Sequence, residues 1–116
     1  MMITIHPFRG LRPRVDLVDK VASKPYDVLN TAEAKVEAQG NPYSFLRVSK
    51  PEINFDNDIN PYADEVYEKG KEVFEQMIHD EILIRDERAC MYIYAQTMLG
   101  RTQTGLVVGS SIDDYF

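Results

Sequence analysis

Three arginines lie within six residues near the start of the chain, at Arg9, Arg12 and Arg14. Proline and glycine interrupt the segment that holds them, residues 7–14, which favours an extended arm. A guanidinium group presents a planar set of N–H donors that matches the oxygens of a phosphate or a carboxylate. The cluster therefore favours an anion site. The alternative is that these arginines pair with the abundant acidic residues of segment 52–87.

Asp27 is the carboxylate whose surroundings best suit chemistry. It follows Pro25 and Tyr26, and the proline ring disfavours a helical conformation at Lys24, so the loop is expected to be rigid. A fixed and partly shielded carboxylate is suited to act as a general base or as an anchor for a ligand. The alternative is that Asp27 caps the turn before Asn30.

Other catalytic signatures are missing from the sequence. The six glycines do not have the spacing of a phosphate-binding loop, and the two histidines, His6 and His79, have no partner at metal-ligand spacing, so we expect no metal site. Cys90 is the only cysteine, which rules out an internal disulfide and fits a reducing compartment. We interpret this thiol as a small hydrophobic core residue.

Composition limits the class of protein. With 116 residues and 44% hydrophobic content, the chain can bury one modest core, and we expect a single domain. The net charge of −6 opposes binding to nucleic acid. Residues 1–30 hold five Lys or Arg against three Asp or Glu, whereas residues 31–116 hold eight against sixteen, so an anion site is best sought near the start. No secretory or membrane-spanning segment is evident, and we expect a cytoplasmic protein without a membrane partner.

The first half of the chain alternates short elements. Asn30 and Glu33 form a capping pair, with Gly40 as the stop signal, and predict a helix over residues 31–39. The other elements expected here are a strand at 3–5, a short helix at 15–22, a strand at 43–48 and an irregular acidic stretch at 52–60.

The second half begins with the longest predicted helix. Asn60 as N-cap, Pro61 at the first helical position, and the acidic Asp64 and Glu65 mark its start. Its expected buried stripe consists of Val66, Gly70, Val73, Phe74, Met77 and Ile78. Residues 82–84 either complete its last turn or begin a strand.

Residues 90–98 and 102–110 predict a β-hairpin connected by residues 99–101. Gly105 and Gly109 interrupt its second strand, which indicates a bulge or a close approach of another backbone or of a ligand, with packing the commoner reason. These elements together predict an α+β fold with a small mixed sheet, a C-terminal β-hairpin and two helices, the longer of them amphipathic.

Four short strings, in this order along the chain, resemble the amino-terminal part of a bacterial and archaeal family catalogued as domain of unknown function 1015. The strings are PFRGLRP at 7–13, KPYDV at 24–28, NPYSFL at 41–46 and QTGLV at 103–107. The resemblance continues to the closing SIDDY at 111–115. It implies that the chain is the amino-terminal part of a longer protein, whose remainder carries an Asp-Gly-His-His-Arg motif.

The motif of the longer family members is itself similar to one in ParB/sulfiredoxin-like free-serine kinases. This implies a nucleotide-dependent phosphotransferase acting on free serine, with ATP or ADP and Mg as cofactors. In that hypothesis Arg9 and Arg12 hold an anionic group, Pro25 and Tyr26 line the substrate pocket, and Asp27 is catalytic. The missing part of the chain supplies the Asp, His and Arg that meet Mg and the phosphates, so these residues alone are expected to be inactive.

Two alternatives belong to other classes. In one, the same pocket belongs to a noncatalytic nucleotide- or anion-binding module of the ParB kind. In the other, the chain is a structural half whose hairpin edge pairs with the rest of its own polypeptide. We expect the hairpin to present an unpaired edge or apolar surface, and self-association to occur through it.

Overall fold

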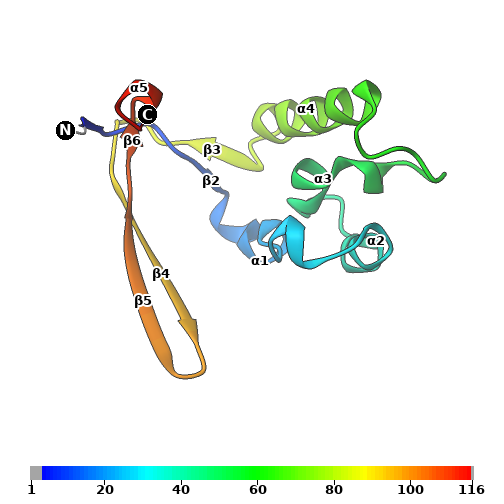
Figure 1. Ribbon diagram of the computed structural model, residues 1–116, viewed down its shortest axis with the longest axis horizontal. Helices are drawn as coiled ribbons and strands as arrows, with labels where there is room; N and C mark the ends of the chain where they lie inside the picture. The colour runs from blue at the N-terminus through cyan, green and yellow to red at the C-terminus, as the bar shows by residue number, and fades with distance from the viewer. Residues whose placement is uncertain (1–3, 116) are drawn as a thin grey trace. The chain divides into compact units, whose positions relative to one another are not determined.

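The computed structural model describes residues 4–115 of the chain. Its contacts divide the chain into two compact units, which are described separately. The central unit consists of Pro13–Ile84, and the terminal unit combines Met1–Arg12 with Arg85–Phe116. The α+β class expected from the sequence is confirmed, because helices and small antiparallel strand pairs are both present (Figure 1).

The central unit is helical apart from its ends. Its 3-10 helices (η) and α-helices are, in chain order, η1 (Val15–Leu17), α1 (Val18–Val21), η2 (Tyr26–Val28), α2 (Thr31–Ala38), α3 (Leu46–Ser49), η3 (Pro51–Asn54) and α4 (Asp64–His79). The short helix predicted at 15–22 corresponds to η1 and α1. None of the helices within residues 4–115 has the length and apolar character needed to cross a membrane.

Helix α2 begins with the predicted capping pair. The Asn30 side chain accepts a hydrogen bond of 2.8 Å from the Glu33 amide, and Glu33 Oε1 accepts one of 3.0 Å from the Asn30 amide. The helix ends at Ala38, one residue before the predicted end, and Gly40 follows with a positive φ of 72°. A left-handed residue at this position suits glycine and stops the helix.

The strand predicted at residues 43–48 is wrong, because this segment forms α3. The Asn41 side chain accepts from the Tyr43 amide at 3.1 Å, and Ser44 Oγ accepts from the Leu46 amide at 3.3 Å. These local bonds turn the chain into a helix, and such bonds compete directly with strand pairing. Leu46 then lies buried, at 2% exposure.

Helix α4 is the long amphipathic helix, but its predicted start is wrong. The cap residue is Ala63, and Asn60 instead makes a separate turn in which its side chain accepts from the Tyr62 amide at 3.0 Å. Asp64 and Glu65 occupy the first turn as expected, where they suit the positive end of the helix dipole. The predicted stripe faces inward, with Val66, Gly70 and Met77 buried and Val73, Phe74 and Ile78 half-buried.

The core of the central unit forms where α2, α3 and η3 meet. Ala34, Ala38, Leu46 and Ile53 make one buried cluster, with Leu29 packed against it. Removing a leucine side chain from water stabilises the fold by about 1.5–3 kcal/mol. The backbone of α4 comes close to η3 at Gly70, because a Cβ built there would lie 3.1 Å from Cγ of Pro51.

The terminal unit contains the long hairpin. Strands β4 (Tyr92–Met98) and β5 (Arg101–Val107) pair in antiparallel register from Tyr92↔Val107 to Met98↔Arg101. The hairpin is as predicted, but its connection has two residues, Leu99 and Gly100, with φ of 53° and 77°. Two positive φ values are typical of the type I′ turn, whose twist matches that of the paired strands.

The other strands are short. Strand β1 (Ile5–His6) pairs antiparallel with β6 (Gly109–Ser110), and a short helix, α5 (Ile112–Tyr115), comes after β6. The predicted strand at 3–5 thus begins at Ile5, and its first residue lies outside the described residues. Strands β2 (Leu11–Pro13) and β3 (Leu83–Arg85) also pair, and the division of the chain into two units falls within them. Residues 82–84 therefore begin a strand instead of ending a helix.

The two strand glycines behave differently. Gly105 pairs with Tyr94 in continuous register, so the segment has no bulge there, and a Cβ at this position would meet nothing within 4 Å. At Gly109 the backbone of β1 comes close, because a Cβ would lie 3.3 Å from the carbonyl oxygen of His6. The prediction of a close backbone approach is thus confirmed at Gly109, whereas neither a bulge nor a neighbouring backbone is found at Gly105.

Candidate functional site around Arg9 and Arg12

The arginine arm is tied to the segment that precedes β4. The amide and carbonyl of Phe8 exchange hydrogen bonds of 2.9 and 2.8 Å with those of Cys90, and the Asp86 amide donates to the carbonyl of Gly10 at 2.8 Å. These bonds connect residues that are more than seventy positions apart in the sequence. They place Arg9 and Arg12 beside residues 85–92 within the terminal unit.

Asp86 is the centre of this arrangement. Its Oδ1 accepts hydrogen bonds from Arg12 Nη2 at 2.7 Å and from Arg12 Nε at 3.1 Å, and its Oδ2 accepts one from the Tyr92 hydroxyl. The Asp86 side chain is 15% exposed, whereas that of Arg12 is 68% exposed. Both carboxylate oxygens are thus occupied by groups of the protein, and the guanidinium still faces solvent.

The hydrogen bonds set the charges of the cluster. The bond from the Tyr92 hydroxyl, together with the weaker effect of the bond from Arg12, lowers the pKa of Asp86 below its ordinary value. The same bond from Tyr92 to Asp86 raises the pKa of Tyr92, and the bond to Asp86 raises that of Arg12. At neutral pH the cluster therefore holds an ionised carboxylate, a neutral phenol and a charged guanidinium.

Gly10 lets Tyr92 approach the arm. The Gly10 amide donates to the Tyr92 hydroxyl at 2.7 Å, and a Cβ built on Gly10 would lie 2.7 Å from that oxygen and 2.8 Å from Cζ. No side chain fits such a space, so a glycine is needed here. The Tyr92 ring also packs on Phe8, with ring centroids 5.1 Å apart. The phenol is therefore held by its ring and by its hydroxyl.

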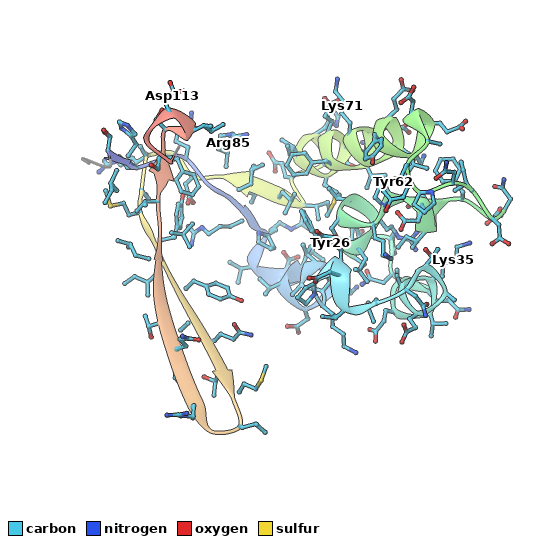
Figure 2. The ribbon with its side chains drawn as sticks, in the orientation of Figure 1. Tyr26, Lys35, Tyr62, Lys71, Arg85 and Asp113 are labelled. Carbon is cyan, nitrogen blue, oxygen red and sulfur yellow. The ribbon has the colours of Figure 1, made fainter. Side chains whose placement is uncertain are left out.

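Two further guanidinium groups join Arg12. Arg9 Nε donates to the backbone carbonyl of Asp86 at 2.7 Å, and Arg85, labelled in Figure 2, donates from Nη1 to the carbonyl of Arg9 at 3.0 Å. Within residues 4–115, no ion pair connects Arg9 or Arg85 to a carboxylate. Three guanidinium groups are thus linked in one network, in which only Arg12 pairs with the Asp86 carboxylate, while Arg9 and Arg85 bond to backbone carbonyls.

The third arginine of the sequence cluster does not belong to this site. Arg14 lies in the central unit, where it pairs with Asp16 at 2.7 Å, and this bond lowers the pKa of Asp16. The alternative interpretation, pairing with the acidic residues of segment 52–87, therefore holds for Arg12, which pairs with Asp86. It does not hold for Arg14, because Asp16 lies outside that segment.

Pro25, Tyr26 and Asp27 lie in the other unit. Tyr26 and Asp27 belong to η2, which comes directly after Pro25, and the Val28 amide donates to the carbonyl of Pro25 at 3.3 Å. All three residues are exposed, with the Tyr26 side chain at 58% (Figure 2). The rigid loop is therefore a helical turn whose carboxylate faces solvent. That Arg9 and Arg12 converge on this turn stays a prediction.

Sequence reasoning missed three residues of the cluster: Gly10, Asp86 and Tyr92. In the sequence, Asp86 is one acidic residue among many in segment 52–87, and Tyr92 belongs to the predicted strand 90–98. No local signal connects them, because each partner of the arm is distant in sequence. Cys90, which is half-buried with its Sγ donating to the Arg88 carbonyl at 3.3 Å, lies beside the site. No group of three or more His, Cys, Asp or Glu within residues 4–115 could hold a metal ion.

Comparisons with known proteins identify the family. The model of the family described as "Protein of unknown function (DUF1015)" matches residues 5–116, nearly the whole chain, and this region includes every residue of the cluster. Neither the curated proteins nor the solved structures yield a match. The family expected from the four short strings is therefore confirmed, and the chain belongs to the DUF1015 family of proteins of unknown function.

Proposed function

We propose that the chain binds a small phosphate- or carboxylate-bearing anion through Arg9 and Arg12. The observation that supports this is the local imbalance of charge, because Arg12 alone pairs with the Asp86 carboxylate while Arg9 and Arg85 are bonded only to backbone carbonyls beside it. The neighbouring Glu87 and Arg88 cancel each other and leave the excess unchanged. A cluster of arginines with exposed donors is suited to an anion with several oxygens.

The way in which Arg9 and Arg12 are held in place also favours the binding of an anion. Arg12 is held on Asp86 through Nε and Nη2, and Arg9 is held through Nε alone, so each guanidinium is fixed at one side. Fixing a long side chain before a ligand arrives lowers the entropy lost on binding. The Tyr92 hydroxyl, which occupies Asp86 Oδ2, further reduces the ability of this carboxylate to repel an anion.

Two versions of this function differ in the step after binding. In the first, the chain is a noncatalytic anion- or nucleotide-binding module of the ParB kind. In the second, it is part of a kinase that transfers a nucleotide phosphate to free serine, with Asp27 as the base or substrate anchor. The exposed carboxylate of Asp27 on the turn η2 favours the second version, because a base must be free to meet a substrate hydroxyl.

Calorimetric titration of the chain with inorganic phosphate and with ADP tests the binding step. We expect Arg9→Ala together with Arg12→Ala to abolish binding, and added salt to weaken it. Arg101→Ala is the matched control, because it removes one exposed arginine of the same unit at the tip of the hairpin. Equal binding by the double variant and the control would refute the site, as would failure of the unmodified chain to bind either ligand.

A separate assay distinguishes the two versions. A longer protein that contains this chain should consume ATP or ADP only when serine and Mg are both present, if it is a kinase. Asp27→Asn should then lower turnover by about two orders of magnitude or more while the protein stays folded. Binding without any serine-dependent consumption of nucleotide would favour the noncatalytic module.

A further inference from the structure

Arg9 and Arg85 are two cations that the described part of the protein does not neutralise. No ion pair within residues 4–115 includes either of them, although the chain has 19 Asp or Glu against 13 Lys or Arg. Each guanidinium instead donates to a backbone carbonyl: Arg9 Nε to that of Asp86 at 2.7 Å, and Arg85 Nη1 to that of Arg9 at 3.0 Å. Acidic residues are in excess, so a shortage of them does not explain the missing ion pairs.

The same two bonds fix the cations and leave most of their donors open. Each side chain reaches the backbone of the segment that carries the other. The two remaining nitrogens of each guanidinium have no hydrogen-bond partner among the described residues, and both arginines are exposed. Two like charges held in this way repel each other, and an anion that contacts both removes the repulsion.

A bulge opposite Arg9 adds uncharged donors. The amides of Asp86 and Cys90 bond to the carbonyls of the residues on either side of Arg9, so residues 87–89 together lie opposite this one arginine. Their three amides have no acceptor within residues 4–115. Successive free backbone amides are suited to the oxygens of an anion.

The charge balance of the site indicates which kind of anion it takes. Arg12 forms an ion pair with Asp86 at 2.7 Å, which leaves Arg9 and Arg85 as an excess of two positive charges. A terminal phosphate group carries a charge of about −1.5 to −2 at neutral pH. It therefore offsets both arginines, whereas a carboxylate or a phosphodiester, each a monoanion, offsets only one.

We propose that Arg85 is a further ligand of the anion site and that the site selects a dianionic terminal phosphate over monoanions. This rests on the proposed function, in which Arg9 and Arg12 bind an anion. A terminal phosphate also presents three oxygens to the open N–H groups, and guanidinium donors match such oxygens in pairs. The phosphate is recognised in the same way whether it is free or ends a larger molecule.

NMR titration of the full chain at constant ionic strength with methyl phosphate and with dimethyl phosphate tests this selectivity. Methyl phosphate has a third terminal oxygen and is a dianion well above its second pKa of about 6. We expect it to bind about tenfold more tightly than dimethyl phosphate, because its second charge meets two guanidinium groups that no carboxylate offsets. Acetate should bind as weakly as dimethyl phosphate.

Variants of Arg85 test its role. Arg85→Ala should weaken methyl phosphate binding about tenfold and reduce the preference over dimethyl phosphate to about threefold or less. Arg85→Lys keeps the charge and should retain most of the preference, which separates the charge from any effect of the alanine variant on folding. Arg101→Ala is the matched control, because it removes the same charge at the tip of the hairpin, and it should leave both affinities unchanged.

The outcomes distinguish this proposal from the anion site itself. Equal binding of methyl phosphate and dimethyl phosphate to the unmodified chain would overturn the preference for a dianion, while the anion site would stand. An unchanged preference in Arg85→Ala, or an equal loss in Arg85→Ala and Arg85→Lys, would overturn the assignment of Arg85. Failure of the unmodified chain to bind these probes or inorganic phosphate would overturn the anion site and this proposal with it.

Discussion

Replacing Gly10 with alanine tests the geometry of the arginine cluster most directly. The added Cβ would lie 2.7 Å from the hydroxyl oxygen of Tyr92 and 2.8 Å from its Cζ, whereas ordinary contact begins at 3.4 Å. The Tyr92 ring, the arm or both must therefore move by roughly 0.7 Å, which overpacks a site that was filled before. Overpacking of this kind costs about 1–3 kcal/mol.

The displaced ring carries its hydroxyl away from Asp86 and from the Gly10 amide. We therefore expect Gly10→Ala to lower the free energy of unfolding of the terminal unit by an amount in that range and to weaken phosphate binding. Urea unfolding followed through the amide NMR signals of the terminal unit measures this, because it separates that unit from the central one. Gly105→Ala is the control in the same unit, and it should be tolerated because nothing lies within 4 Å of its Cβ.

A double-mutant cycle isolates the cause. In a Tyr92→Val background the ring is gone, so Gly10→Ala should cost clearly less than it does beside tyrosine. Equal costs in the two backgrounds would show that the ring does not approach Gly10, and the described cluster would then be wrong.

Two further predictions concern the capping pair and pH. Asn30→Ala should lower the stability of the central unit by about 1 kcal/mol in urea unfolding, because it removes the cap of α2, and Asn30→Asp should largely retain it; an unchanged midpoint for the alanine variant would contradict this. The lowered pKa of Asp86 gives stability that is fully present above the ordinary carboxyl pKa of 3.8 and is lost as pH falls through the lower folded value. The raised pKa of Tyr92 gives stability that is present below its ordinary 10.0 and is lost as pH rises through the higher folded value. We therefore expect the free energy of unfolding of the terminal unit to fall less steeply on acidification for Asp86→Asn than for the unmodified chain. Identical pH profiles for the two proteins would count against the Asp86 contacts.

The elements that could be predicted are those whose cause is local. The capping pair of Asn30 and Glu33 is set by side chains three residues apart, and the buried stripe of α4 results from helical spacing. The strand prediction for residues 43–48 was wrong for a related, local reason. Its apolar residues fit a strand pattern, but the Asn41 and Ser44 side chains bond to nearby amides and start a helix instead.

The sequence by itself determined the family, the α+β class, the hairpin and the presence of arginines suited to an anion near the start of the chain. Only the tertiary structure showed what those arginines meet. Arg12 forms a hydrogen bond with Asp86, 74 residues away, and Gly10 forms one with Tyr92, 82 residues away. No periodicity or spacing in the sequence predicts such contacts. The physical reason is that short-range patterns reflect backbone hydrogen bonding and local burial, whereas the partner of a charged side chain depends on which distant segments the fold brings together.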